Sequence, residues 1–346
     1  MQRGSLFAAL LACLTTTASA VSPSTPTSLN ALFAADLGDT RATLLIVGGK
    51  VEAKRYAPGY SDANRFISWS MAKTVTAVVV GELVADGRLT LDAPAPIAEW
   101  QQAGDPRRAI TLRHLLTMSS GLRHVEVGEP IEASDTNQVL FVGGTQGMAA
   151  RAIGAPLVAP PGTVFNYSSL TSIILAEIVT RTLTPSRDPR VRAAAYRDFV
   201  EARVFGPAGI RSAVLDFDGA GTQVGGSIIY MTLDDWGRFG TLLLDGGRVI
   251  APEWLAFMKT PSAADRAYGG QTWLNRVPDK GKAPLVPGKA PETLVSMNGH
   301  LGQFVFASPD SAGGRGAVLV RLGNTRDGET RAVLDAMGDV MSRYGT

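Results

Sequence analysis

The pattern of apolar and polar positions predicts strands towards both ends of the chain and helices between them. Two short strand-like runs, residues 44–47 and 51–56, are joined by Gly48-Gly49, which favours a β-hairpin. Residues 94–217 carry helical and loop signals, with a clear helix at 170–180. Strand character then returns at 228–231, 271–274, 303–307 and 317–322, before a closing helix at 330–344. This order predicts an α+β fold, with an antiparallel sheet built from both chain ends and a mainly helical insertion.

One predicted helix is apolar nearly all round. It is expected to run from about Ser70 to Asp86, with Gly87 as its left-handed stop. A helix with so few polar residues on any face belongs in the interior rather than on the surface. Any polar side chain that it carries is then buried or close to buried.

The first forty residues are expected to lie outside the folded domain. Residues 1–20 resemble a cleavable export signal, with Arg3, an apolar stretch from Leu6 to Leu14, and Ala18-Ser19-Ala20 as the cleavage site. Residues 21–40 are expected to be a flexible lead-in, since they begin with a Ser, Thr and Pro-rich run. The protein is therefore expected to be exported, to a periplasm or outside the cell.

The remainder, residues 41–346, is expected to be a single catalytic domain. Its α/β lobe would comprise about 41–93 and 218–346, and its helical lobe about 94–217. No segment after the signal approaches the roughly 20 apolar residues of a membrane-spanning helix, so the mature chain is expected to have none. The sequence does not indicate an oligomeric state.

Composition excludes several function classes. Basic and acidic residues nearly balance, at 33 and 31, and the basic ones are scattered, so nucleic-acid binding is not expected. The single cysteine, Cys13, falls inside the export signal, which leaves no thiol for a disulfide, a metal or nucleophilic attack. The chain also lacks a Gly-x-Ser-x-Gly elbow, a His-Glu-x-x-His zinc site and a phosphate-binding Gly-x-x-x-x-Gly-Lys loop. We expect no metal and no cofactor.

The tetrapeptide Ser70-Met71-Ala72-Lys73 places a hydroxyl and an amine three residues apart, on one face of the expected helix. A serine hydroxyl becomes a nucleophile when a base takes its proton. Burial in this apolar stretch would lower the pKa of Lys73, as a lysine base requires. The alternative is that Ser70 caps the helix and Lys73 extends to the surface.

Two further segments are candidates for the same site. Tyr167 follows a Pro-Gly turn and precedes a helix, where a loop can deliver a side chain into a cleft; the alternative is an ordinary amphipathic tyrosine. The run Asn298-Gly299-His300-Leu301-Gly302-Gln303 leads into a strand, and its glycines permit close backbone approach to a ligand.

These three segments, in this order and at these separations, resemble the motifs of penicillin-recognising serine hydrolases: Ser70-Met71-Ala72-Lys73, Tyr167-Ser168-Ser169 and His300-Leu301-Gly302. The resemblance extends to residues 110–122 and 225–240 and covers most of the chain from about residue 40. Within the superfamily it is closest to the class C β-lactamase-related and 6-aminohexanoate-dimer hydrolase branch.

The resemblance implies a small-molecule ester or amide substrate and an acyl-enzyme on Ser70, with Lys73 and Tyr167 transferring protons. It also implies an oxyanion hole formed by the backbone N–H groups of Ser70 and Gln303, with His300, Gly302 and Ser169 lining the substrate site.

Two departures from the β-lactamase pattern affect the expected substrate. Ser169 stands where those enzymes commonly have an asparagine, and His300 stands where they commonly have a lysine. The first removes an amide that could hold an acylamino arm, and the second removes a fixed charge that could attract a carboxylate. We therefore expect esters and small amides rather than penicillins.

Three alternatives stay open. The chain could be a β-lactamase or D,D-peptidase, or a binding or sensor domain that deacylates slowly. A Ser70-His300-acid triad is conceivable, but it leaves Lys73 without a role. His114 and His124 are expected to be structural or solvent-facing.

Overall fold

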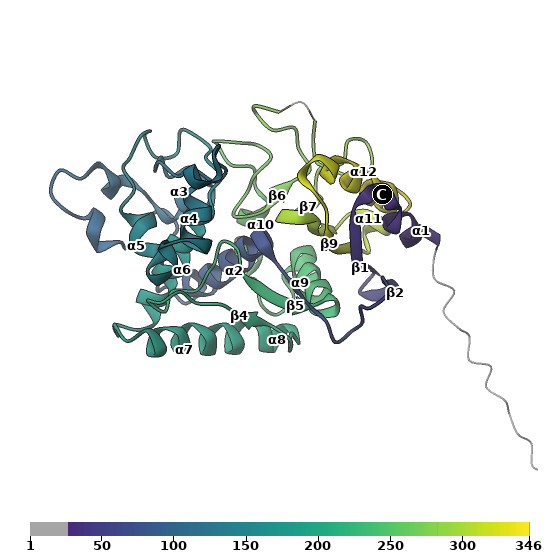
Figure 1. The fold of residues 1–346 in the computed structure, drawn as a ribbon, viewed down its shortest axis with the longest axis horizontal. Helices are drawn as coiled ribbons and strands as arrows, with labels where there is room; N and C mark the ends of the chain where they lie inside the picture. Colours follow the sequence, from purple (N-terminus) through teal and green to yellow (C-terminus); the bar gives the residue numbers. More distant parts are fainter. Residues whose placement is uncertain (1–26, 282, 346) are drawn as a thin grey trace, which may run out of the picture.

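The structure is a computed structural model that describes residues 27–281 and 283–345, arranged as two lobes side by side (Figure 1). One lobe contains the large sheet and both ends of the described chain. The other lobe is mainly helical. The expected export signal lies outside the described residues.

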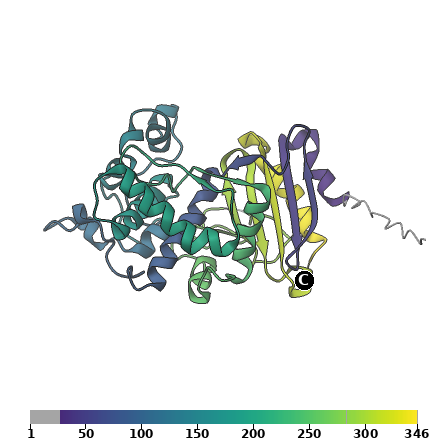
Figure 2. The ribbon, with the colours of Figure 1, turned by 90° about the horizontal axis from the view of Figure 1, so that it is seen from below.

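The large sheet has six strands in the order β2-β1-β9-β8-β7-β6, with every neighbouring pair antiparallel. Strands from the two chain ends lie side by side at its centre, as the sequence predicts (Figure 2). The strands are β1 (Asp39–Val47), β2 (Lys50–Tyr56), β6 (Trp273–Leu274), β7 (Val295–Gly299), β8 (Gln303–Ser308) and β9 (Ala317–Asn324).

Alternating side chains of the sheet enter two separate cores. Leu44 and Ile46 of β1 join the core beneath α9 (Leu233–Asp245), whereas Leu45 and Val47 join the core beneath α12 (Thr330–Ser342). This period of two is the expected consequence of burying both faces of a pleated sheet. The sheet is thus held rigidly between helices.

The supposed lead-in differs from the sequence expectation. From Thr27 onward the chain forms α1 (Thr27–Asn30) and two short 3₁₀ turns, and Leu29 and Leu32 are buried against the sheet face that α12 covers. Apolar residues at this spacing belong to the core. They were included in the predicted flexible lead-in because the residues before them are rich in Ser, Thr and Pro.

A second, three-stranded sheet has the order β3-β5-β4, made from β3 (Arg65–Ile67), β4 (Val214–Leu215) and β5 (Ile229–Thr232). The strand expected at 228–231 belongs to this small sheet rather than to the large one. Its neighbour β3 leads directly into the segment that carries Ser70. The small sheet therefore helps to fix where that segment begins.

The apolar helix is α2 (Ala72–Ala85), and it is buried from Ala72 to Leu83, as predicted. Its predicted start was wrong. Ser70 lies in a 3₁₀ turn, Trp69–Met71, just before the helix, and Trp69 has a φ of +43°. Bulky residues rarely adopt that conformation, so the residue types do not predict this tight entry.

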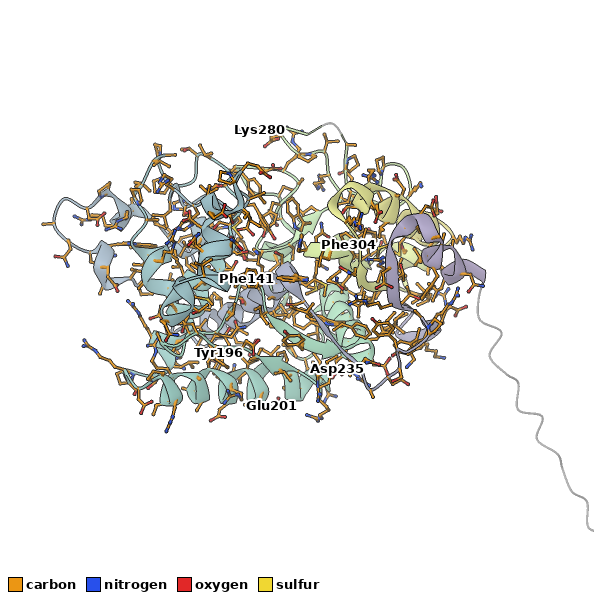
Figure 3. The ribbon with its side chains drawn as sticks, in the orientation of Figure 1. Phe141, Tyr196, Glu201, Asp235, Lys280 and Phe304 are labelled. Atoms are coloured by element: carbon orange, nitrogen blue, oxygen red, sulfur yellow. The ribbon has the colours of Figure 1, made fainter. Side chains whose placement is uncertain are left out.

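Helix α6 (Ser169–Leu183) packs directly against α2. On α7, Tyr196 points into the molecule, while Glu201, just beyond the helix, points outward (Figure 3). The others are α3 (Leu112–Leu116), α4 (Asp135–Phe141), α5 (Met148–Ile153), α7 (Pro189–Val200), α8 (Gly206–Ala208), α10 (Pro252–Lys259) and α11 (Ser311–Gly314). Within the described residues, no helix combines the length and apolar character needed to cross a membrane.

Candidate active site

Ser70 and Lys73 lie together at the entrance to α2. The amine Nζ of Lys73 is 2.9 Å from Oγ of Ser70. Ser70 is half-buried, whereas Lys73 is only 1% exposed. The alternative in which Lys73 extends to solvent is therefore wrong.

Two further oxygens hold the amine of Lys73. Oγ of Ser169 lies 2.8 Å from Nζ and the carbonyl oxygen of Gly226 lies 2.7 Å from it. Burial lowers the pKa of Lys73 to about 8, against the opposing effect of the Glu126 carboxylate. With a pKa near 8, about a tenth of this lysine is an uncharged amine at pH 7, and only that form can act as a general base.

Gly226 must be a glycine because the chain passes so close to α6. A Cβ atom built on Gly226 would lie 2.5 Å from the carbonyl oxygen of Ser169, which is backbone and cannot swing aside. This close approach lets the carbonyl of Gly226 reach Lys73. It explains why position 226 of the Gly-Gly-Ser run is a glycine.

Tyr167 lies over Lys73, on the loop that enters α6. The Lys73 amine is 4.8 Å from the centroid of the Tyr167 ring, and the phenol has Ser70 and Trp273 as hydrogen-bond partners. The ring packs against Tyr268 and Trp273, with centroids 6.0 and 5.3 Å away. The aromatic surroundings fix the phenol beside the Ser70 hydroxyl.

The loop that carries Tyr167 is anchored by the segment Ile110–Leu122. The backbone N–H of Asn166 donates to the carbonyl of Met118, and its side-chain amide donates to the carbonyls of Leu122 and His124. Residues 110–122 are one of the stretches that resemble the serine hydrolase pattern. They hold the Tyr167 loop in place and are not among the residues that line the pocket above Ser70.

Burial raises the pKa of the Tyr167 phenol above its ordinary value, and the Glu126 carboxylate adds to this effect. Hydrogen bonding to Ser70 and Trp273 acts in the opposite direction without cancelling it. Tyr167 is therefore a neutral phenol at physiological pH. It can relay a proton, while Lys73 is the better resting base.

The third segment forms the turn between β7 and β8, with His300–Gly302 as a single 3₁₀ turn. The guanidinium of Arg321, which is fully buried, donates to the carbonyl of Gly302 from behind. The end of β7 lies against the segment that carries Ser70, since a Cβ on Gly299 would clash with the carbonyl oxygen of Ser68. The turn is thus held rigidly beside Ser70.

The structure brings His300 to the site but not the side chain of Gln303. The His300 ring lies 5.5 Å from that of Trp69, edge to face, and lines the same pocket as Ser70. The Gln303 side chain is buried and exchanges hydrogen bonds with the backbone of Gly323. The role expected of Gln303 concerns its backbone N–H in the oxyanion hole, and it stays a prediction.

A pocket of about 350 Å³ opens above Ser70. One wall is apolar, and Phe141, labelled in Figure 3, is exposed at the end of α4. The pocket also contains the carboxylates of Glu126 and Glu129, and no Lys or Arg side chain is among the described residues that line it. Its apolar members are Trp69, Val127, Ile131, Leu140 and Phe141.

A model of the family described as Beta-lactamase matches residues 30–340 of the chain. The chain belongs to the beta-lactamase family. A curated relative in Paenarthrobacter ureafaciens, a 6-aminohexanoate-dimer hydrolase, is 27% identical over 238 residues. That match covers 62% of this chain and 56% of the relative, so the chain spans little more than half of the relative's length.

Solved structures show the same fold as this beta-lactamase family member. A putative 6-aminohexanoate-dimer hydrolase from Bacillus anthracis superposes with a TM-score of 0.67 at 22% identity, covering 86% of this chain and 77% of that one. A beta-lactamase/D-alanine carboxypeptidase from Yersinia pestis superposes with a TM-score of 0.66 at 17% identity, covering 92% and 97%. The predicted β-lactamase/transpeptidase-like fold is confirmed.

Sequence reasoning missed one polar residue of this family member's site, Glu126. Its carboxylate accepts hydrogen bonds from the Ser169 hydroxyl, the Ser169 backbone N–H and the Thr136 hydroxyl, each at 2.6 Å. It lies 4.0 Å from the Lys73 amine. No sequence signal marks it, because it stands in an acidic loop whose glutamates would ordinarily face solvent.

The other two histidines have structural roles. His114 Nδ1 accepts from the N–H of Thr111, whose hydroxyl accepts from the N–H of His114, which closes the first turn of α3. His124 is buried, with Nε2 3.0 Å from the carbonyl oxygen of Ala152. Across residues 27–281 and 283–345, no group of three His, Cys, Asp or Glu side chains is placed to hold a metal ion.

Proposed function

We propose that this protein hydrolyses esters and small amides through an acyl-enzyme on Ser70. The observation that carries the proposal is the 2.9 Å contact between the Ser70 hydroxyl and the buried amine of Lys73, whose pKa is lowered to about 8. Neither group alone identifies a reaction. Together they form a nucleophile with a base poised to take its proton.

In the proposed reaction, Lys73 takes the Ser70 proton while Oγ bonds to the substrate carbonyl carbon. The carbonyl oxygen becomes an oxyanion, held by the N–H of Ser70 and a second backbone donor. The N–H of Gln303 is the donor that the resemblance implies, and the turn from His300 to Gly302 lies beside the same pocket.

Collapse of the tetrahedral intermediate expels the alcohol or amine. Tyr167 gives its phenolic proton to the leaving group and recovers a proton from the Lys73 ammonium beneath it. Water then attacks the acyl carbon while Lys73 or Tyr167 takes its proton, and that proton passes to Oγ of Ser70 as the bond between Oγ and the acyl carbon breaks and the acid leaves. No group outside this chain is needed for these proton transfers.

The pocket supports an apolar acyl group and disfavours an anion. An aromatic and aliphatic wall faces the substrate, while Glu126 and Glu129 supply negative charge near Ser70. The carboxylate of a penicillin or cephalosporin would meet His300 rather than a fixed ammonium. The names of the Paenarthrobacter and Bacillus anthracis proteins lend support to an amide of an aliphatic amino acid as one substrate.

A hydrolysis panel tests the proposal. The substrates are p-nitrophenyl butyrate, the linear 6-aminohexanoate dimer and nitrocefin, each measured with the wild type and with Ser70→Ala. We expect Ser70-dependent turnover of the ester, the amide dimer or both, and little turnover of nitrocefin. Fast nitrocefin turnover would favour a β-lactamase, and a single stoichiometric acylation without turnover would favour a sensor.

We also propose that the protein is exported and loses its first twenty residues. The support is the order of Arg3, the apolar stretch and Ala18-Ser19-Ala20. Intact-mass measurement of the protein recovered from the periplasm or medium tests this, and a mature start near Val21 is expected. Recovery of the full-length chain only from the cytoplasm would contradict it.

A further inference from the structure

Glu126 is connected to the catalytic lysine through a single hydroxyl. The Ser169 hydroxyl donates to Oε1 of Glu126 at 2.6 Å and lies 2.8 Å from Nζ of Lys73. The second oxygen of Glu126 accepts from the Ser169 N–H and from the Thr136 hydroxyl. Three donors directed at one carboxyl group are what an ionised carboxylate attracts.

This connection fixes the direction of the Ser169 hydroxyl. A serine has one hydroxyl proton, and here that proton is directed at Glu126. Towards Lys73, Ser169 can therefore only accept. The carbonyl of Gly226, on the other side of the amine, is also only an acceptor.

A neutral lysine amine has two N–H bonds and one lone pair. Ser169 and Gly226 each accept one N–H, so the third direction, towards Ser70 at 2.9 Å, is left for the lone pair. The lone pair then points at the proton that it must remove. If the Ser169 hydroxyl were free to rotate, it could donate to Lys73 and occupy that lone pair.

We infer that Glu126 is a positioning residue, which acts through Ser169 to direct the Lys73 lone pair at Ser70 and to stabilise the ammonium that forms. The inference rests on the proposed acyl-enzyme mechanism. After proton transfer, the same three oxygens accept all three N–H bonds of the ammonium, with the Glu126 carboxylate 4.0 Å away.

The other groups around Lys73 do not replace this carboxylate. Tyr167 is a neutral phenol and Tyr268 lies behind it, His300 lies in the pocket beside Trp69, and Glu129 is exposed at the rim. Glu126 is the negative charge that raises the pKa of Lys73 against the effect of burial. Its removal should therefore lower the pKa of Lys73.

The test compares Glu126→Gln with the matched control Glu129→Gln, which removes a carboxylate from the same pocket. The measurement is kcat/KM for p-nitrophenyl butyrate between pH 5 and 10. We expect the acidic limb of Glu126→Gln to move to lower pH by about one unit, since an opposite charge at this range shifts a pKa by about that much. For Glu129→Gln, the pH at the midpoint of the acidic limb should stay within roughly 0.2 unit of the wild-type value, because an exposed charge is screened.

A second pair of variants tests the orientation and is independent of how Glu126→Gln folds. Ser169→Ala removes the connecting hydroxyl. Ser227→Ala removes a nearby buried hydroxyl from the same pocket, which reaches Oγ of Ser169 through a long hydrogen bond of 3.5 Å. We expect the alkaline plateau of kcat/KM to fall at least about ten-fold for Ser169→Ala and by clearly less for Ser227→Ala. Thermal unfolding of each variant checks that the fold persists.

The outcomes separate this inference from the function on which it rests. A folded, active Glu126→Gln with an unmoved acidic limb, or equal plateaus for Ser169→Ala and Ser227→Ala, would overturn the role of Glu126. A wild type that is inactive, or a Ser70→Ala variant that is active, would contradict the proposed mechanism itself. A shifted limb and a lowered plateau together support the inference.

Discussion

The amine of Lys73 lies 2.9 Å from the hydroxyl oxygen of Ser70, inside a protein interior that leaves only 1% of the lysine exposed. Most lysines are charged and face solvent. Here the apolar residues of α2 and the loop that carries Tyr167 enclose it. The pH dependence of the reaction follows from this one relationship.

The rate should rise with pH and reach half its plateau near pH 8. Burial lowers the pKa of Lys73 to about 8, and the amine is a base only in its uncharged form, which grows as pH rises through that value. The measurement is kcat/KM for p-nitrophenyl butyrate from pH 5 to 10. An acidic limb of the pH profile that disappears in His300→Gln would move the base role to His300.

Removing either proton-transfer group should slow the reaction sharply. Lys73→Ala and Tyr167→Phe are each expected to lower kcat/KM by about 100-fold or more, since such groups contribute about 10²–10⁴. Tyr167→Phe is the cleaner variant because the ring and its packing against Trp273 are kept. Near-wild-type rates for both variants, with unchanged thermal unfolding, would contradict the assigned roles.

Ester hydrolysis should exceed cephalosporin hydrolysis. The kcat/KM for p-nitrophenyl butyrate is expected to be at least about ten-fold above that for nitrocefin, because each missing charge-assisted contact costs about 1.5–3 kcal/mol. The structural reason is that the pocket holds His300 and Ser169 together with the carboxylates of Glu126 and Glu129, and no Lys or Arg is among the described residues that line it. A nitrocefin value equal to or above the ester value, from the same preparation, would contradict this reading of the pocket.

Gly226→Ala should damage both the fold and the site. The new methyl group would lie 2.5 Å from the Ser169 carbonyl oxygen, so the free energy of unfolding is expected to fall by about 1–3 kcal/mol, as for other overpacked sites. Gly328→Ala is the control, since a Cβ there meets nothing within 4 Å. Urea unfolding of both variants makes the comparison; equal stabilities would contradict the close-approach argument.

The sequence predicted the segment that carries Ser70 and Lys73, the loop that carries Tyr167 and the order of the main strands because each has a local pattern. The spacing of Ser70 and Lys73 is set by the 3₁₀ turn and the start of α2 that follows it, and Tyr167 follows a turn that Pro161 and Gly162 predict. The large sheet followed from strand-like runs at both chain ends. Such local patterns can be recognised without knowing which distant residues pack together.

What escaped prediction depends on contacts between distant residues. Glu126 reaches Lys73 through Ser169, 43 positions later in the chain, and an acidic loop gives no sign of such a contact. β7 was missed because Ser296, Asn298 and Gly299 disfavour a strand, yet pairing with β8 forms one. The left-handed Trp69 is imposed by the junction of β3 and α2 rather than by its own preference.

Trapping the acyl-enzyme tests the central claim most directly. Wild type and Ser70→Ala are mixed with excess p-nitrophenyl butyrate, quenched in acid within milliseconds to seconds, and measured by intact-protein and peptide mass spectrometry. The account predicts one butyryl group per wild-type chain, located on Ser70, and none on the Ser70→Ala variant, which should still unfold cooperatively. An acyl group on another residue, or substantial turnover by a folded Ser70→Ala variant, would contradict it.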